Sequence, residues 1–343
     1  MKALLIGGTG TISTDITKLC VEKGFDITLL NRGNHSGRLH EGMMISKWPL
    51  DINDEAAVAA RMDGEFFDVI VNFINYTVEE IERDIRLFSG KTRQYIFIST
   101  ASAYQKPPSH YKITESTPLY NPYWAYSRAK IVCEERLMTE YRQKGFPITI
   151  VRPSHTYDRY KLPVSIHGEN GSWSTIKRMI DGKPILVLGD GTSLWPLTHS
   201  RDFARGFIGL MGNVSALGEA VHITTDEALT WNQIYTIIGN HLGVEPKLAH
   251  VSTDFIVAVD PAQSGPLLGD KSRTVVFDNS KIKRLVPGFE ATIRFDRGVK
   301  DPIEYFLNTP EAQIEDPKFD RFTDAIISAQ ETAKELAKKA YSV

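Results

Sequence analysis

The stretch that decides the fold is MKALLIGGTGTIS, residues 1–13. The apolar residues 3–6 predict a short buried strand, and the glycine-rich run GGTG (7–10) follows at once. A glycine turn in this place lets backbone N–H groups approach a pyrophosphate, while the next helix points its positive end at the same group. Glycines after a buried strand also form plain tight turns. The run by itself therefore leaves both interpretations open.

The first half of the chain alternates strand and helix patterns. Strands are expected at 3–6, 25–31, 42–51, 67–75, 94–100 and 147–153. A helix is expected over 77–88, and another should begin after Asn53 as its N-cap. Strands separated by helices of this length predict an α/β fold with a doubly wound parallel sheet, the Rossmann fold.

The second half is less regular. Helices are expected at 172–181 and 231–242, a third should begin at Asp202 as its N-cap, and 252–275 is expected to be loop. We expect a dinucleotide-binding domain over 1–153, which elements from about 183–225 rejoin, a smaller interleaved substrate-binding portion over 154–310, and a helical extension over 311–343 that packs on the body.

The composition is that of an ordinary globular protein. Of 343 residues 42% are apolar and 24% charged, and the formal net charge is −2, so no basic excess points to nucleic acid as the main partner. Cys20 and Cys133 lie in helical patterns, which argues against a disulfide framework. No apolar run approaches the ~18 residues of a membrane span, and we expect a cytoplasmic protein without a membrane partner.

A second motif, YWAYSRAKIVCEERLM (123–138), places Tyr126 and Lys130 one helical turn apart on the same face. An ammonium held near a phenol is expected to lower the phenol's pKa, so that the tyrosine exchanges a proton with a hydroxyl or carbonyl near neutral pH. Such pairs also occur by chance on helix surfaces. Here the pair follows the glycine turn and ISTASAY (98–104), a strand end that carries Thr100, and this order makes chance a poor explanation.

With these motifs the sequence resembles the extended short-chain dehydrogenase/reductase family, the NAD-dependent epimerase/dehydratase group. The resemblance covers about 1–310 and rests on GGTGTIS (7–13), Asp51–Ile52, IST…Y (98–104), YSRAK (126–130), RPS (152–154) and LGDGTSLWPLTHSRDFARGF (188–207). It implies Tyr126 as catalytic acid/base, Lys130 as its electrostatic and ribose-binding partner, and Thr100 as hydrogen-bond partner of the reacting oxygen. The implied cofactor-binding residues are Gly7, Thr9, Gly10, Thr11, Ile12, Asn31, Arg32, Asp51, Ile52, Phe73, Asn75, Tyr126, Lys130 and Pro153.

Two departures from the family bear on the cofactor. Ser13 stands at the third glycine of the turn and is small enough that cofactor binding should survive, with a slightly shifted helix. Asn31, followed by Arg32, stands where NAD enzymes of this kind carry an acidic residue for the ribose 2′-hydroxyl. A guanidinium there can hold a 2′-phosphate, so that the cofactor is NAD(P) with a preference for NADP. Alternatively, Arg32 only stacks on adenine and both cofactors bind.

Other departures bear on the substrate. Ala101 and Ser102 replace the Asp-Glu pair of sugar-nucleotide dehydratases, which disfavours dehydration, and Trp195 stands near the place of an arginine that grips the substrate pyrophosphate in epimerases. The expected substrate contacts are Ser102, His155, Tyr157, Trp195 and Arg201, and the histidines show no metal-ligand spacing.

We therefore expect an epimerase or oxidoreductase that acts on a hydroxyl or ketone of a sugar or nucleotide-sugar, in a homodimer. The stretch 183–242 looks most like a subgroup that includes chloroplast stem-loop RNA-binding proteins. The alternative is accordingly an epimerase-like RNA-binding protein without turnover, although the near-neutral charge counts against RNA.

Overall fold

The main sheet has seven parallel strands. The computed structural model describes residues 1–33, 38–39 and 42–342. The strands lie in the order β12-β7-β5-β4-β1-β2-β3, and their bounds are β1 (Lys2–Ile6), β2 (Asp26–Leu30), β3 (Ile45–Trp48), β4 (Val69–Asn72), β5 (Tyr95–Ile98), β7 (Ile148–Pro153) and β12 (Ala220–Ile223). The predicted doubly wound fold is confirmed. The carboxyl ends of β1, β2 and β4 meet at one edge, where Ile6 pairs with Leu30 and Asn72.

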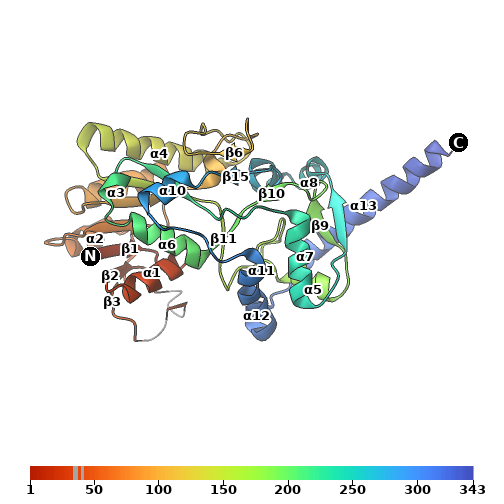
Figure 1. The fold of residues 1–343 in the computed structure, drawn as a ribbon, viewed down its shortest axis with the longest axis horizontal. Coiled ribbons are helices and arrows are strands. Elements are labelled where there is room, and N and C mark those ends of the chain that lie inside the picture. Colours follow the sequence, from red (N-terminus) through yellow and green to blue (C-terminus); the bar gives the residue numbers. More distant parts are fainter. Residues whose placement is uncertain (34–37, 40–41, 343) are drawn as a thin grey trace.

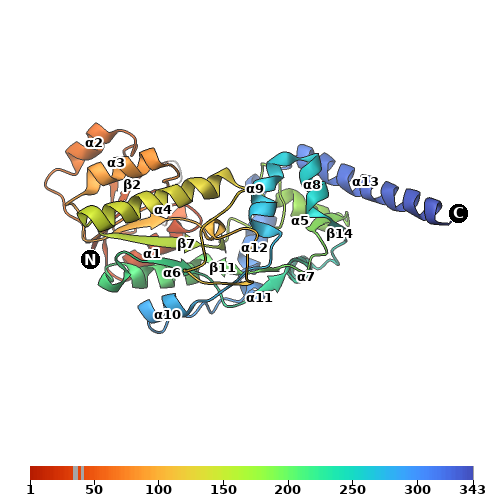
Figure 2. The ribbon, with the colours of Figure 1, turned by 90° about the horizontal axis from the view of Figure 1, so that it is seen from above.

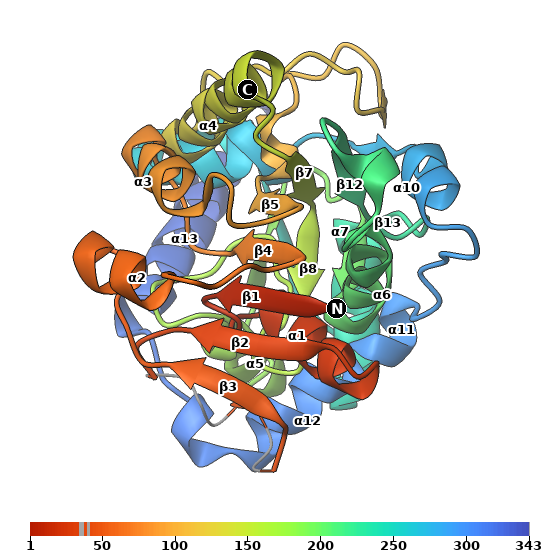
Figure 3. The same cartoon turned by 90° about the vertical axis from the view of Figure 1, so that its left-hand side faces the viewer.

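Helices cover both faces of this sheet (Figure 3). On one face lie α2 (Glu55–Arg61), α3 (Val78–Phe88) and α4 (Ala125–Lys144), and on the other α1 (Ser13–Glu22) and α6 (Ser200–Leu210), with α10 (Ser280–Leu285) beside α6. Ile16 and Phe207 belong to the core on the α1 side, and Ile81 and Cys133 to the core on the α4 side. Because both faces are covered, the inner strands β1 and β4 are nearly continuous apolar runs, whereas the edge strand β3 has two exposed polar residues in its middle.

The rest of the chain forms a second lobe, which Figure 1 shows beside the sheet. Its short strands pair two by two: β8 (His155–Tyr157) with β11 (Leu197–His199), β9 (Ile185–Leu188) with β14 (Leu248–Val251), β10 (Leu194–Trp195) with β13 (Leu229–Thr230), and β6 (Lys112–Ile113) with β15 (Val276–Phe277). Its helices include α5 (Trp173–Ile180), α7 (Trp231–Leu242), α11 (Phe295–Gly298) and α12 (Lys300–Asn308). A separate apolar core that includes Trp195 and Trp231 holds this lobe together.

Two predicted helix caps are wrong. Asp54, not Asn53, caps α2, and its carboxylate accepts a hydrogen bond from the Ala57 N–H at 3.1 Å. The side chain of His199, not that of Asp202, caps α6. Asp202 lies inside the helix and is fully buried, where it accepts from the Ile293 N–H at 2.7 Å. At α2 an equally good acceptor stands next to the true N-cap, whereas at α6 the cap is a histidine, which the usual preference for Asn, Asp, Ser and Thr does not predict.

The loop predicted over 252–275 is also wrong. It contains α8 (Thr253–Val259), η4 (Pro261–Gln263), α9 (Ser264–Pro266) and a π-helical turn, η5 (Leu267–Lys271). Pro261 stands at the start of η4, where its missing N–H needs no partner, so this proline begins a helical turn instead of excluding one.

The C-terminal helix α13 (Pro317–Tyr341) packs only through its first half. Phe319, Thr323 and Ile326 are buried, whereas every described residue from 331 to 342 is exposed. Figures 1 and 2 show this part projecting away from both lobes. The predicted packing of the helical extension therefore holds for half of the helix.

No helix in the described part of the chain is long and apolar enough to cross a membrane.

Candidate active site

The glycine turn leaves no room for side chains. Gly7 has φ +89°, and a Cβ there would lie 2.8 Å from Cγ2 of Ile74. A Cβ on Gly8 would lie 2.6 Å from a methyl group of Leu29. The turn leads into α1, whose N-cap, Ile12, makes no side-chain cap hydrogen bond. A bare backbone at the start of an uncapped helix is the cradle that the pyrophosphate of a dinucleotide requires.

Ser13, at the third glycine position, is accommodated inside this turn. It is buried, and its hydroxyl accepts a hydrogen bond from the Gly10 N–H at 2.7 Å. The serine thus holds a backbone donor that a bound phosphate would otherwise be free to use.

A cavity of about 390 Å³ lies on one side of the turn. Its lining includes the predicted residues Gly7, Thr9, Asn31, Arg32, Asp51 and Ile52, together with Tyr76, which the sequence motifs did not identify. Arg32 is exposed, and its Nη1 lies 3.9 Å from an Asp51 carboxylate oxygen. Asn31 accepts from the Gly33 N–H at 3.0 Å. A pocket of this size, at the carboxyl ends of β1 and β2, suits the adenosine half of a dinucleotide.

A second cavity, of about 330 Å³, lies on the other side of the turn. It is lined by eight of the predicted residues: Thr11, Ile12, Thr100, Ser102, Tyr126, Pro153, His155 and Trp195. Lys106, Lys161 and Asp270 also line it, although no motif marked them. Because Thr11 and Ile12 follow the turn directly, this cavity is where the nicotinamide end and a substrate would meet.

Tyr126 enters this cavity from the first turn of α4. The ring of Trp124 lies 5.0 Å from its ring centre and that of Tyr76 lies 6.3 Å away. Burial raises the pKa of Tyr126 to about 12, while the Thr100 hydroxyl acts in the opposite direction. The predicted lowering of this pKa is therefore wrong, because loss of hydration outweighs the hydrogen bond with the Thr100 hydroxyl.

Lys130 lies one turn below Tyr126 and is buried, with 2% of its surface exposed. Its ammonium donates to the carbonyl oxygens of Asn75 and Ile98, the latter at 2.7 Å. It also lies 4.7 Å from the ring centre of Tyr76 and 5.9 Å from that of Tyr126. Burial lowers the pKa of Lys130 to about 8, so the ammonium form still predominates at neutral pH.

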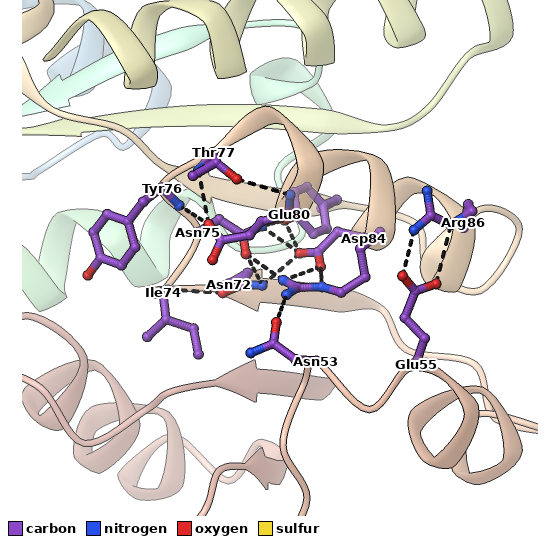
Figure 4. A network of polar contacts seen from close by, with 12 residues as sticks. Asn53, Glu55, Asn72, Ile74, Asn75, Tyr76, Thr77, Glu80, Asp84 and Arg86 are labelled. Carbon is purple, nitrogen blue, oxygen red and sulfur yellow. Dashed lines mark hydrogen bonds and ion pairs between the residues drawn. The ribbon is translucent and has the colours of Figure 1, made fainter. Parts of the chain in front are cut away.

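A buried polar network lies behind the carbonyl that holds Lys130 (Figure 4). Asp84 accepts from Asn72 at 2.6 Å, from Asn75 at 2.7 Å and from the Tyr95 hydroxyl at 2.6 Å, and Arg83 donates to Asp84 and to Asn75. The Asn75 side chain is therefore turned into the network and away from the cavity. Its carbonyl oxygen positions Lys130, and the cofactor contact expected of Asn75 stays a prediction.

A second buried group fixes the position of α4 against the sheet. Arg152, on β7, donates to both carboxylate oxygens of Glu134, at 3.0 Å through Nε and at 2.5 Å through Nη2. The Ser99 hydroxyl, at the end of β5, donates to the same carboxylate. Because Glu134 lies one turn beyond Lys130, this bidentate pair sets the register of the helix that carries Tyr126.

Three other predicted residues lie elsewhere. Tyr157 is fully buried, with its ring 5.1 Å from that of His199 and 5.6 Å from that of Phe295. Arg201 forms an ion pair with Asp301 and lines a different cavity, behind α1. Neither Tyr157 nor Arg201 lines the cavity that contains Tyr126, and the substrate contacts expected of them stay predictions. Phe73 is partly buried and packs against the core on the α1 side, its ring 6.0 Å from that of Phe207.

The residues that sequence reasoning missed come from segments without a recognisable motif. Lys106 lies between β5 and β6, Lys161 lies between β8 and α5, and Asp270 lies in the π-helical turn η5 within the supposed loop. Only the fold brings them to one cavity. In the described ranges no three His, Cys, Asp or Glu side chains are grouped as metal ligands.

Comparisons with known proteins agree with this geometry. The profile of the NAD dependent epimerase/dehydratase family matches residues 3–224. The chain is 22% identical over 294 residues to the 2'-dehydrokanamycin reductase of Streptomyces kanamyceticus. The aligned region covers 84% of this chain and 80% of that protein. It is 25% identical over 264 residues to the chloroplast stem-loop binding protein of 41 kDa b of Arabidopsis thaliana. This alignment covers 73% of this chain and 65% of that protein.

Solved structures show the same fold. The dTDP-glucose 4,6-dehydratase of Bacillus anthracis, in complex with NAD, superposes with a TM-score of 0.73 at 17% identity, over 91% of this chain and 98% of that chain. An epimerase from Methanothermobacter thermautotrophicus has a TM-score of 0.75 at 14% identity, over 90% and 93% of the two chains. At these identities the likeness shows the fold alone.

Proposed function

The chain belongs to the NAD-dependent epimerase/dehydratase family, and on that premise we propose that it is an NAD(P)-dependent oxidoreductase or epimerase. Its substrate is a sugar or nucleotide-sugar, and the reaction takes place at a hydroxyl or ketone carbon. The observation that carries the proposal is that Thr100 and Tyr126 line one cavity together with Thr11 and Ile12, the residues that follow the glycine turn. A binding module would not need a phenol and a hydroxyl beside the cofactor seat.

The site's residues move and hold a proton. When bound, the nicotinamide accepts or returns a hydride at the reacting carbon. Tyr126 takes the proton of a substrate hydroxyl, or gives one to a ketone oxygen, while the Thr100 hydroxyl holds that oxygen. With its pKa near 12, the phenol is protonated at neutral pH and suited to donate a proton. In the opposite direction, the Lys130 ammonium, 5.9 Å from the ring centre, stabilises the phenolate.

Dehydration is not part of the proposal, because no carboxylate stands beside Thr100. Ser102 follows instead, and its hydroxyl lies 2.9 Å from that of Thr100 and 2.7 Å from that of Ser127. This chain of hydroxyls orients Thr100 toward the reacting oxygen, and it supplies no base for elimination.

Replacement of Tyr126 by Phe tests the proposal. A ligand that copurifies with the protein is first identified by mass spectrometry, and sugars of its class are then screened for a change in nicotinamide absorbance. We expect Tyr126→Phe to lower turnover by about 10²–10⁴-fold with cofactor affinity unchanged, because the phenol touches the reacting oxygen and not the glycine turn. Tyr120→Phe, at an exposed tyrosine, is the matched control. Full activity of Tyr126→Phe would refute the assignment.

For the cofactor, we propose a preference for NADP. The support is that Arg32 and the neutral Asn31 line the cavity that suits the adenosine half, and a guanidinium can hold a 2′-phosphate through paired hydrogen bonds. For the assembly, we propose a homodimer through α4 and its neighbour α3. Val132, an exposed apolar residue of α4, would be covered in it. Sedimentation velocity of the unaltered protein and of Val132→Glu tests this, and a monomer in both cases excludes the dimer.

The second candidate is RNA binding without turnover. It rests on the likeness to the chloroplast stem-loop binding protein. Titration with a structured RNA, with and without ~100 mM added salt, separates the two functions. Tight binding that salt weakens strongly, together with no nicotinamide absorbance change on any sugar, would favour the RNA-binding protein.

A further inference from the structure

Cationic side chains outnumber anionic ones in the cavity that contains Tyr126. Lys106 and Lys161 line it, and Asp270 is the one carboxylate in its lining among the described residues. The next residue, Lys271, is also buried, with 8% of its surface exposed, and its ammonium reaches only the Val164 carbonyl, at 3.3 Å. Asp270 and Lys271 both lie in the π-helical turn η5, and such turns recur at functional sites.

These charges are not balanced inside the protein. Two carboxylates lie near the three lysines: Asp158 acts on Lys161, and Asp270 acts on Lys106 and Lys271. Asp270 lies near Lys106 and Lys271, and it can neutralise one of them. Burial and the neighbouring Lys161 lower the pKa of Lys271 to about 8. Lys106 and Lys271 are buried and share the carboxylate of Asp270, whereas Lys161 is exposed and faces Asp158, so these cations exceed the nearby carboxylates by one. A buried cation without a counterion is unfavourable, and an anionic ligand would balance this excess positive charge.

Two hydrogen-bonding groups in the same cavity also lack partners. Nε1 of Trp195 and Nε2 of His155 are buried, and neither has a hydrogen-bond partner among the described residues. The indole nitrogen is a donor only, so its partner must be an acceptor. Burial and the two nearby lysines lower the pKa of His155, which is therefore neutral at pH 7 and can carry its proton on Nε2. Two N–H groups without acceptors, close to cationic side chains, are the features of a site that binds an anion.

We propose that the substrate is a compact sugar that carries its own anionic group, a carboxylate or a phosphate monoester, held in this cavity by Lys161, Trp195 and His155. The inference rests on the proposed function and narrows its substrate class. A nucleotide diphosphate is the less suitable occupant, because the cavity measures about 330 Å³ and must also admit the nicotinamide.

Small anions test the site without knowledge of the sugar. The protein is saturated with NAD, which occupies the glycine turn and keeps phosphate from binding there. Inorganic phosphate, acetate and neutral glycerol are then titrated, with tryptophan fluorescence as the signal, because Trp124 and Trp195 line the cavity. We expect a saturable change with phosphate or acetate and none with glycerol. A stronger response to phosphate indicates a phosphate monoester, and a stronger response to acetate indicates a carboxylate.

Lys161→Gln should weaken the binding of the anion by about tenfold or more, because it removes one charged hydrogen bond. Lys177→Gln, at an exposed lysine of α5 that pairs with Asp181, is the control and should change nothing. Thermal unfolding shows that each variant is folded. Lys271→Met removes another cation of the same group and should also weaken the binding of the anion.

Two results would overturn the inference: no response to either anion, or unchanged anion affinity in folded Lys161→Gln and Lys271→Met. UDP that binds tenfold more tightly than phosphate would exclude the compact substrate. Failure of the proposed function looks different, because NAD would then not bind, and the anion titration of the cofactor-free protein would still report on this site.

Discussion

Lys130 allows a quantitative prediction about stability and pH. Burial lowers its pKa from the ordinary value of 10.5 to about 8. The charged form is therefore disfavoured in the folded protein, which costs about 3 kcal/mol of stability at pH 7. Between pH 8 and 10.5 the unfolded chain keeps a proton on this lysine that the folded protein has released. Stability must then rise with pH in that window, by about 2 kcal/mol between pH 7 and 9.5 from this residue alone.

Lys130→Met isolates this contribution. The variant loses the hydrogen bonds to the Asn75 and Ile98 carbonyls, which cost about 1–3 kcal/mol each when left unmade, but it also removes the unfavourable burial of a charge. At pH 7 the two effects nearly cancel, and the variant should fold with stability within about 3 kcal/mol of the unaltered protein. At pH 9.5 the unaltered protein should have gained about 2 kcal/mol relative to the variant.

Urea denaturation of both proteins, without cofactor, at pH 7 and pH 9.5 measures this difference. All other titrating groups are common to the two proteins, so they cancel in the comparison. Parallel pH dependence of the two free energies of unfolding would refute the reasoning, because it would mean that Lys130 is hydrated in the folded protein.

Three further predictions concern the cofactor seat and the network behind it. Arg32→Ala should weaken NADP binding about tenfold or more and leave NAD binding unchanged, and equal NADP affinities in a fluorescence titration would contradict the preference. Ser13→Gly frees the Gly10 N–H for the pyrophosphate and should lower the cofactor dissociation constant about threefold by calorimetry, whereas an unchanged constant would show that this donor is not used. Asp84→Ala leaves the buried Arg83 without its carboxylate and should reduce the free energy of unfolding by about 3–5 kcal/mol. A loss below about 1 kcal/mol in urea denaturation would show that the arginine finds another partner.

Sequence patterns predicted the structure correctly where all the residues that form the pattern lie in one short segment of the chain. The continuous apolar runs, the helix between them and the glycine turn predict the order of strands and helices without reference to distant residues. The same holds for the spacing of Tyr126 and Lys130, since one helical turn places them on a common face. Patterns failed where neighbouring residues compete for one role, as Asn53 and Asp54 do for the cap of α2.

The sequence by itself determined the doubly wound fold, the glycine turn after β1 and the spacing of Tyr126 and Lys130, because each depends on residues close together in the chain. Only the tertiary structure decided that Tyr157 and Arg201 lie away from the cavity, while Lys106, Lys161 and Asp270 line it. It also decided the sign of the Tyr126 pKa shift. The physical reason is that burial and the meeting of distant segments set the electrostatics of a site, and neither quantity is encoded in any single stretch of chain.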